Sequence, residues 1–281
     1  MSNANQNTTT SDPAPPLIRV RQSPRRITHA FIDFDGTVSL LRTGWWRIMA
    51  DVALEQFHEE EAIREANRSR FTDEILKLNG KPPAIQIQRL ADMMLDEDGL
   101  ETSASDMTAT FHERLTRELE DRKRGLIEAS IPADSFLVHG VTGFLNHLSR
   151  NNVQLHLVTG TEQSLAAHEL TILGLDGLFG DSVHGPSAEA ISFSKQTVFE
   201  RLMQEHILTP GEVLVVGDGF VEMALAAERG MPCFGIACLE SENGSGKLEP
   251  DRVRHLTEAR ADVILPDFRD AIALFESISE S

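Results

Sequence analysis

The second half of the chain alternates between short, wholly apolar runs and longer segments in which apolar residues recur at helical spacing. Runs without polar alternation are typical of strands buried on both faces of a parallel sheet, and the segments between them are typical of helices. The pattern predicts strands at 27–35, 155–158, 213–216, 233–237 and 263–265. It predicts helices at 141–148, 164–173, 194–206, 221–229 and 268–275. We therefore expect an α/β fold with a doubly wound parallel sheet.

Between the first strand and the rest of the sheet the pattern is different. From residue 41 to about 121 no strand-like run occurs, and apolar residues such as Trp45, Ile48 and Met49 share one helical face. We expect an all-helical domain at 41–134. It would interrupt an α/β core domain formed by 27–40 and 135–281.

Composition narrows the class of function. The 26 Lys and Arg against 44 Asp and Glu give a net charge of −18, which argues against nucleic acid as a partner. No run of apolar residues is long enough to span a membrane. Two cysteines, Cys233 and Cys238, are too few for a disulfide framework, so we expect a cytoplasmic protein. Residues 1–26 lack periodicity and predict a disordered leader.

Two carboxylates directly follow the first predicted strand. Residues 33–37 read Asp-Phe-Asp-Gly-Thr. Asp33 and Asp35 at the end of a buried strand require a cation or a reaction to offset their burial, and Gly36 permits a sharp turn. A plain Asp-Gly turn after a strand is the alternative.

Two further clusters suit an anionic group. Thr159 and Gly160 follow the second strand and open a helix, where a hydroxyl and free amides could bind phosphate. A capping box with Glu162 is the alternative. Lys195 stands near the start of a later helix, where it could bind the same anion or be an ordinary surface charge.

The last cluster follows the most apolar strand of the chain. Residues 217–222 read Gly-Asp-Gly-Phe-Val-Glu, which again places acidic groups and glycines where a parallel strand ends. Asp218 could be a simple helix N-cap, but a cap would not require Gly217 or Glu222.

In this order, the four clusters resemble the signature of the haloacid dehalogenase-like superfamily of phosphohydrolases, and the helical insertion resembles that superfamily's cap domain. The segments 35–40, 217–222 and 264–268 look like a bacterial branch of this superfamily without an assigned substrate. The resemblance implies a Rossmann-like core with a helical cap.

The resemblance also implies roles for the acidic residues. Asp33 would be the nucleophile that forms an aspartyl-phosphate, and Asp35 would be the general acid and base. Mg²⁺ would be held by Asp33, the backbone carbonyl of Asp35 and Asp218. Glu222 stands where the superfamily more often has Asp, so it could reach the metal through water or contact the lysine.

The phosphoryl oxygens would be bound by Thr159, by the amide of Gly160 and by Lys195. A carboxylate at position 35 suits phosphate esters, whereas dehalogenase and phosphonate-cleaving relatives lack an acid there. The cap would select the substrate.

The cap residues nearest the first cluster are candidates for substrate contact. We select Arg42, Trp46 and Arg47, with plain surface charge as the alternative for the two arginines. Trp45 shares its face with Ile48 and Met49, which favours core packing.

Together these features predict a Mg²⁺-dependent phosphomonoester hydrolase of a small phosphorylated metabolite, such as a sugar or polyol phosphate. A phosphomutase of the β-phosphoglucomutase type would use the same residues. A metabolite-binding or regulatory protein without turnover is the alternative from another class.

Overall fold

The computed structural model describes residues 17–18, 26–57, 61–78, 83–187 and 193–279. A seven-stranded sheet in the order β1-β7-β6-β5-β2-β3-β4 forms its centre. The strands are β1 (Leu17–Ile18), β2 (His29–Ile32), β3 (Gln154–Val158), β4 (Val183–His184), β5 (Val213–Gly217), β6 (Cys233–Ile236) and β7 (Val263–Leu265). Neighbouring strands from β2 to β7 are parallel, and β1 is antiparallel to β7.

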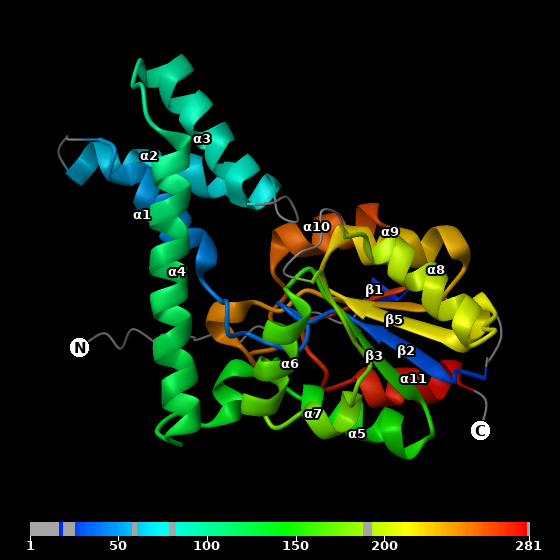
Figure 1. Ribbon diagram of the computed structural model, residues 1–281. Helices are drawn as coiled ribbons and strands as arrows, with labels where there is room; N and C mark the ends of the chain where they lie inside the picture. The colour runs from blue at the N-terminus through cyan, green and yellow to red at the C-terminus, as the bar shows by residue number, and fades with distance from the viewer. Residues whose placement is uncertain (1–16, 19–25, 58–60, 79–82, 188–192, 280–281) are drawn as a thin grey trace, which may run out of the picture.

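Helices cover both faces of this sheet (Figure 1). They are α5 (Val141–Arg150), α6 (Gln163–Ile172), α7 (Asp176–Phe179), α8 (Lys195–Glu205), α9 (Phe220–Arg229), α10 (Pro250–Glu258) and α11 (Ala271–Ile278). Side chains of α8, α9 and α10 form one apolar core with the sheet, and side chains of α5, α6 and α11 belong to the other. The predicted doubly wound α/β fold is confirmed.

Four helices form a separate layer beside the sheet domain (Figure 1). They are α1 (Trp45–Leu54), α2 (Glu61–Lys77), α3 (Pro83–Asp98) and α4 (Ala104–Ile127). Met49, Phe71, Leu90 and Phe111 are buried in their common core. The predicted cap is therefore all-helical among the described residues. The C-terminal turns of α4 carry Lys123 to the sheet domain, where it pairs with Glu169.

Two short strands were not predicted. Leu17–Ile18 lies inside the predicted disordered leader, yet it pairs with Val263 and Ile264 of β7. Without it, β7 would present unpaired backbone groups at the sheet edge, so this pairing covers the edge. The expectation of a leader without structure is wrong at these two residues, and 1–16 and 19–25 lie outside the described residues. Strand β4, also of two residues, is too short to form an apolar run.

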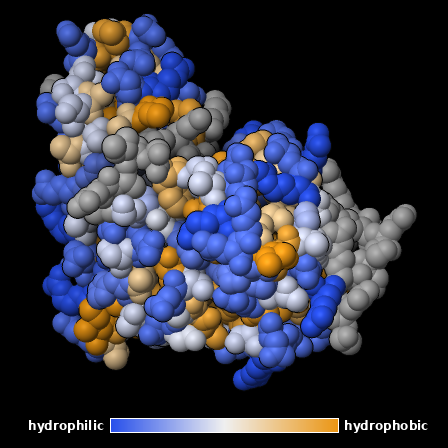
Figure 2. All heavy atoms as spheres, turned by 45° about the vertical axis from the view of Figure 1, so that its right-hand side comes forward, coloured by the Kyte–Doolittle hydropathy of each residue, from blue (hydrophilic) through white to orange (hydrophobic). Residues whose placement is uncertain are grey.

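One face of the molecule is mostly hydrophilic (Figure 2). On the face shown in Figure 2, hydrophobic residues are dispersed among hydrophilic ones. Within the described ranges, no helix combines the length and apolar character that a bilayer crossing requires.

The strand register places the polar clusters at one edge. Ile32 of β2 pairs with Leu157 of β3 and with Val216 of β5. Because the strands are parallel, Asp33 and the residues that follow β3 and β5 lie at the carboxyl ends that these strands share. The amide of Asp33 donates a hydrogen bond of 2.9 Å to Val216 O.

Short 3₁₀ turns at Ala133–Phe136, Pro210–Glu212 and Glu240–Glu242 complete the fold.

Candidate active site

A lysine ammonium lies between two carboxylates at the carboxyl edge of the sheet. Lys195 Nζ lies 2.8 Å from Asp33 Oδ1 and 3.0 Å from Glu222 Oε2. Lys195 is the first residue of α8, so the start of this helix directs the side chain to the end of β2. Burial alone would lower the pKa of Lys195, but the charges of Asp33 and Glu222 hold that pKa above its ordinary value. The interpretation of Lys195 as a surface charge is therefore wrong.

Glu222 is buried and uses both carboxylate oxygens. Oε1 accepts a hydrogen bond of 2.7 Å from the amide of Gly219, and Oε2 accepts one from Lys195. The first contact stabilises the start of α9, and the second orients the lysine. Burial works to raise the pKa of Glu222, but the Lys195 charge and these hydrogen bonds together lower it. Glu222 is thus anionic and positions Lys195.

Gly217 is required by the packing of Glu222. A Cβ atom at position 217 would lie 2.5 Å from Glu222 Cγ, well inside van der Waals contact. We expect Gly217→Ala to lower the free energy of unfolding by about 1–3 kcal/mol, as overpacking does in protein cores. Urea unfolding followed by circular dichroism measures this.

The matched control for that variant is Gly143→Ala in α5, where an added Cβ meets nothing within 4 Å. Alanine should stabilise this helix by about 0.5–1 kcal/mol. Equal unfolding midpoints for Gly217→Ala and the parent would contradict the packing argument.

Asp218 packs against the turn that follows β2. A Cβ at Gly36 would lie 2.3 Å from Asp218 Oδ2, and Gly36 has a φ of +76°. Glycine is therefore needed at position 36 both for the left-handed turn and for the close approach of Asp218. Thr37 Oγ1 donates to Asp218 Oδ1 at 3.4 Å.

Arg252 is a site residue that the sequence did not reveal. Its Nε lies 3.4 Å from Asp218 Oδ2, and its guanidinium also contacts Glu240 and the Cys238 carbonyl. Arg252 comes from α10, outside every recognised cluster. No local pattern marks it, because its partners come from other segments of the chain.

The acidic residues fit a hard divalent cation. Asp33, Asp218 and Glu222 each offer a carboxylate oxygen, and these oxygens lie within 4.8 Å of one another. Burial raises the pKa of Asp33 well above its ordinary range against the opposing charge of Lys195, and Glu222 and Asp218 add to the rise. Burial likewise raises the pKa of Asp218 to about 6, although Arg252 opposes this. A bound cation that prefers oxygen ligands would offset the cost of burying these carboxylate charges. Mg²⁺ is such a cation.

Asp35 is held by two side chains. Arg42 Nη1 donates to Asp35 Oδ1 at 2.8 Å, and Thr161 Oγ1 donates to Asp35 Oδ2 at 2.6 Å. Arg42 also forms a two-pronged contact with Glu169, at 2.7 and 2.9 Å. Arg42, which we expected to contact substrate, therefore bridges Asp35 and a fully buried glutamate.

Lys123 completes this second ion-pair group. Its Nζ lies 3.1 Å from Glu169 Oε1, and both side chains are buried. Because Lys123 belongs to α4 and Glu169 to α6, the ion pair joins the helical cap to the sheet domain. Both residues were missed by sequence reasoning, because buried charges within amphipathic helices resemble solvated ones in the sequence.

The segment after β3 forms a turn before α6. Thr159 is buried, and its Oγ1 accepts the amide of Thr161 at 3.0 Å. Gly160 is exposed, and an added Cβ there would meet no atom within 4 Å. The N-cap of α6 is Glu162, which accepts the amide of Ser164, so the alternative of a capping box starting at Thr159 is wrong.

A cavity of about 410 Å³ lies between the cap and the sheet domain. Trp45, Trp46 and Arg47 line it from the cap, and Arg252 lines it from α10. The Arg47 guanidinium carbon lies 5.0 Å from the centre of the Trp46 ring. Arg252, which lines the cavity, also contacts Asp218, so the cavity adjoins the acidic residues of the site. Two of the three predicted specificity residues therefore line one cavity, and Arg42 does not.

Comparison with known proteins identifies the family. A family model described as a hydrolase, haloacid dehalogenase-like hydrolase, matches residues 27–230. The chain belongs to the haloacid dehalogenase-like hydrolase family. The resemblance recognised in the four sequence clusters is confirmed. No protein of curated function matches the sequence of this haloacid dehalogenase-like hydrolase.

Solved structures share the fold of this haloacid dehalogenase-like hydrolase. A predicted phosphoglycolate phosphatase from Haemophilus somnus 129pt is 17% identical with a TM-score of 0.60, covering 88% of this chain and 97% of its own. A haloacid dehalogenase family hydrolase from Deinococcus radiodurans R1, with bound phosphate and sodium, is 14% identical with a TM-score of 0.59, covering 92% and 100%. A β-phosphoglucomutase from Clostridium difficile is 13% identical with a TM-score of 0.50, covering 83% and 96%. At these identities the likeness establishes the fold.

Proposed function

We propose that the chain is a Mg²⁺-dependent phosphomonoester hydrolase that acts on a small phosphorylated metabolite through an aspartyl-phosphate. The observation that carries the proposal is the placement of Lys195 Nζ at 2.8 Å from Asp33 Oδ1, beside Asp218 and Glu222. A buried nucleophilic carboxylate, a cation for phosphoryl oxygens and a set of metal ligands are the parts that phosphoryl transfer needs.

In the first step, an Asp33 carboxylate oxygen attacks phosphorus, and the bond from phosphorus to the ester oxygen breaks. Asp35 gives a proton to the departing alkoxide, so that the product leaves as an alcohol. In the second step, water gives a proton to Asp35 and attacks the aspartyl-phosphate, which releases inorganic phosphate and restores Asp33.

The remaining groups would stabilise the transferred phosphoryl group. Lys195 would pair with one oxygen, and Thr159 with the amide of Gly160 would bind others. Mg²⁺, held by Asp33, the backbone carbonyl of Asp35 and Asp218, would offset the repulsion between the anionic nucleophile and the anionic ester. Glu222 already contacts Lys195 and Gly219, so we assign it the positioning of the lysine rather than a direct metal bond.

The cavity between cap and sheet domain supports a small polar substrate. Its lining combines an aromatic surface from Trp46 with cations such as Arg47 and carboxylates such as Glu240. Mixed donors and acceptors beside an aromatic ring suit a substrate with several hydroxyl groups, such as a sugar or polyol phosphate.

The test is release of inorganic phosphate from a panel of phosphorylated metabolites that includes a hexose 1-phosphate. We expect Mg²⁺-dependent release that stops when EDTA removes the metal and returns when Mg²⁺ is restored. A hexose 6-phosphate product that forms only with added hexose bisphosphate would instead indicate a mutase. Absence of turnover across the panel, with Mg²⁺ present, would contradict the hydrolase and favour a binding protein.

A further inference from the structure

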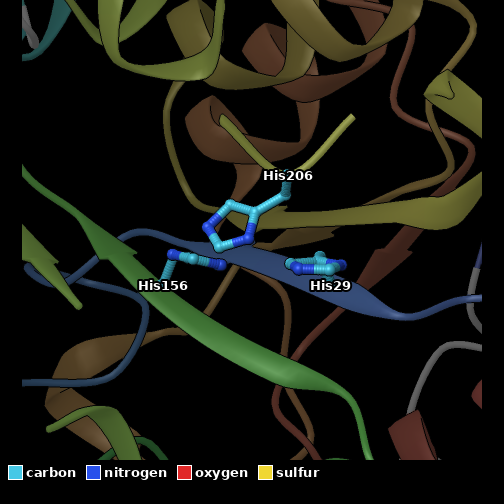
Figure 3. A group of neighbouring side chains, drawn as sticks. All are labelled: His29, His156 and His206. Atoms are coloured by element: carbon cyan, nitrogen blue, oxygen red, sulfur yellow. The ribbon is translucent and has the colours of Figure 1, made fainter. Parts of the chain in front are cut away.

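A second cluster of metal-ligating side chains lies away from the candidate active site. His29 begins β2, His156 stands within β3, and His206 directly follows α8 (Figure 3). Asp33 lies beyond the carboxyl end of β2, whereas His29 lies at its amino end. The histidines therefore form a separate group, on the sheet face that α8 covers.

The three imidazoles converge. Ring centroids lie 5.5 Å apart for His29 and His156, 4.9 Å for His29 and His206, and 5.2 Å for His156 and His206. In Figure 3, His29 and His156 are seen edge-on at the same level, and the ring of His206 lies over the space between them. One ring nitrogen from each lies within 4.8 Å of the other two.

His156 is the strongest sign of an unsatisfied site. It is 1% exposed, and neither of its ring nitrogens has a hydrogen-bond partner among the described residues. A buried polar side chain without partners is costly, and it usually indicates a bound ion or water. His29 Nδ1 lies 2.9 Å from the hydroxyl of Thr28, which leaves Nε2 of His29 available as a ligand.

The surroundings disfavour the charged forms of His29 and His156. Burial and the charges of neighbouring histidines lower the pKa of His156 to about 3. Burial and the charge of His206 also lower the pKa of His29, although Gln154 and Glu212 oppose this. Neutral imidazole nitrogens carry the lone pairs that metal binding requires.

We propose that His29, His156 and His206 form a Zn²⁺ site. Imidazole ligands suit Zn²⁺, whereas Mg²⁺ prefers oxygen, so this site and the Asp33 site would take different ions. Nitrogens around a tetrahedral Zn²⁺ stand about 3.3 Å apart, given bonds of about 2.0–2.1 Å, so binding requires the three rings to move closer than their present separation of up to 4.8 Å. Water completes the coordination.

The bound ion would fasten α8 to the sheet. Lys195 opens α8 beside Asp33, and His206 follows the last residue of the same helix. A metal that joins His206 to β2 and β3 therefore fixes the end of the helix opposite Lys195. We therefore expect the ion to stabilise the sheet domain.

The test uses Co²⁺ as a spectroscopic substitute for Zn²⁺, added to full-length, metal-depleted protein in excess Mg²⁺. Four-coordinate Co²⁺ with nitrogen ligands absorbs strongly in the visible range, whereas Co²⁺ among carboxylates and water absorbs weakly. We expect one strongly absorbing Co²⁺ per chain, displaced by one equivalent of Zn²⁺. Since outer-shell changes alone cost about 10–100-fold, His206→Ala should weaken binding by more than about 100-fold.

His168→Gln is the matched control, because His168 is exposed on α6, away from the cluster. This variant should keep both the Co²⁺ spectrum and the rise in Tm that Zn²⁺ gives the parent. His156→Phe, which keeps an apolar ring in the buried position, should lose both while retaining the circular dichroism of a folded protein. Equal Co²⁺ spectra for the parent and His206→Ala, or no strongly absorbing Co²⁺ in the folded parent, would overturn the proposal.

Discussion

Asp33→Asn is expected to abolish phosphate release, with a loss of at least about 10³-fold in kcat, or about 4 kcal/mol of transition-state stabilisation. An amide oxygen cannot form the aspartyl-phosphate, so both steps of the proposed reaction are lost. Steady-state release of inorganic phosphate at saturating Mg²⁺ measures the loss. Mass spectrometry of acid-quenched enzyme should show the phosphorylated species in the parent only.

The fold of this variant should be intact. Burial raises the pKa of Asp33 in the folded state, so its ionised form is less stable there than in the unfolded chain. A neutral residue of the same shape removes this cost at neutral pH. The substitution also removes one of the two carboxylates that pair with Lys195, and Glu222 remains as the other. These two effects oppose each other, so in metal-free buffer the free energy of unfolding should stay close to that of the parent.

A matched control separates the role of the nucleophile from general charge effects. Asp181→Asn changes an exposed aspartate and should leave kcat unchanged. Turnover of Asp33→Asn within tenfold of the parent would disprove the assignment of the nucleophile.

The sheet could be predicted because its strands are buried on both faces. Val213–Gly217 and Val263–Leu265 are continuous apolar runs, and a buried strand is the simplest explanation of each. The two-residue strands Leu17–Ile18 and Val183–His184 carry no such signal. Their pairing depends on a neighbouring edge that exists only after the sheet has formed.

The site was predictable where its residues follow strand ends. Asp33 and Asp218 were identified in that way, and the structure brings them together with Lys195 and Glu222. Arg252 was not identifiable, because its contact with Asp218 joins separate segments of the chain.

The contacts of Asp35 were equally hidden from the sequence. Arg42 and Glu169 meet across 127 positions of sequence, and neither belongs to a local motif. Thr161 lies two positions after Thr159, yet its hydroxyl reaches Asp35 only because β2 and β3 are adjacent. Partners of this kind are defined by the tertiary fold.

The histidine cluster had one sequence signal. His156 interrupts an otherwise apolar strand between Leu155 and Leu157. A polar ring at a position that the pattern predicts to be buried requires a partner, and the structure shows the imidazoles of His29, His184 and His206 beside it.

Asp35→Asn should slow both halves of the reaction, by about 10²–10⁴-fold in kcat for an alkyl phosphate. The amide can neither protonate the departing alkoxide nor accept a proton from water. Arg42 keeps its contact with Glu169 in this variant, so the segment leading into α1 should remain in place. The measured effect then reports chemistry rather than a displaced cap.

Substrates with different leaving groups distinguish the two roles of Asp35. With p-nitrophenyl phosphate the leaving group needs no proton, so the first step should stay fast in Asp35→Asn while hydrolysis of the aspartyl-phosphate stays slow. The variant should then show a burst of p-nitrophenol and accumulate phosphorylated enzyme. Thr161→Val, which removes one hydrogen bond to Asp35 but keeps the carboxylate, should show a smaller loss and no accumulation. Rapid turnover of both substrate types by Asp35→Asn would show that another group carries the proton.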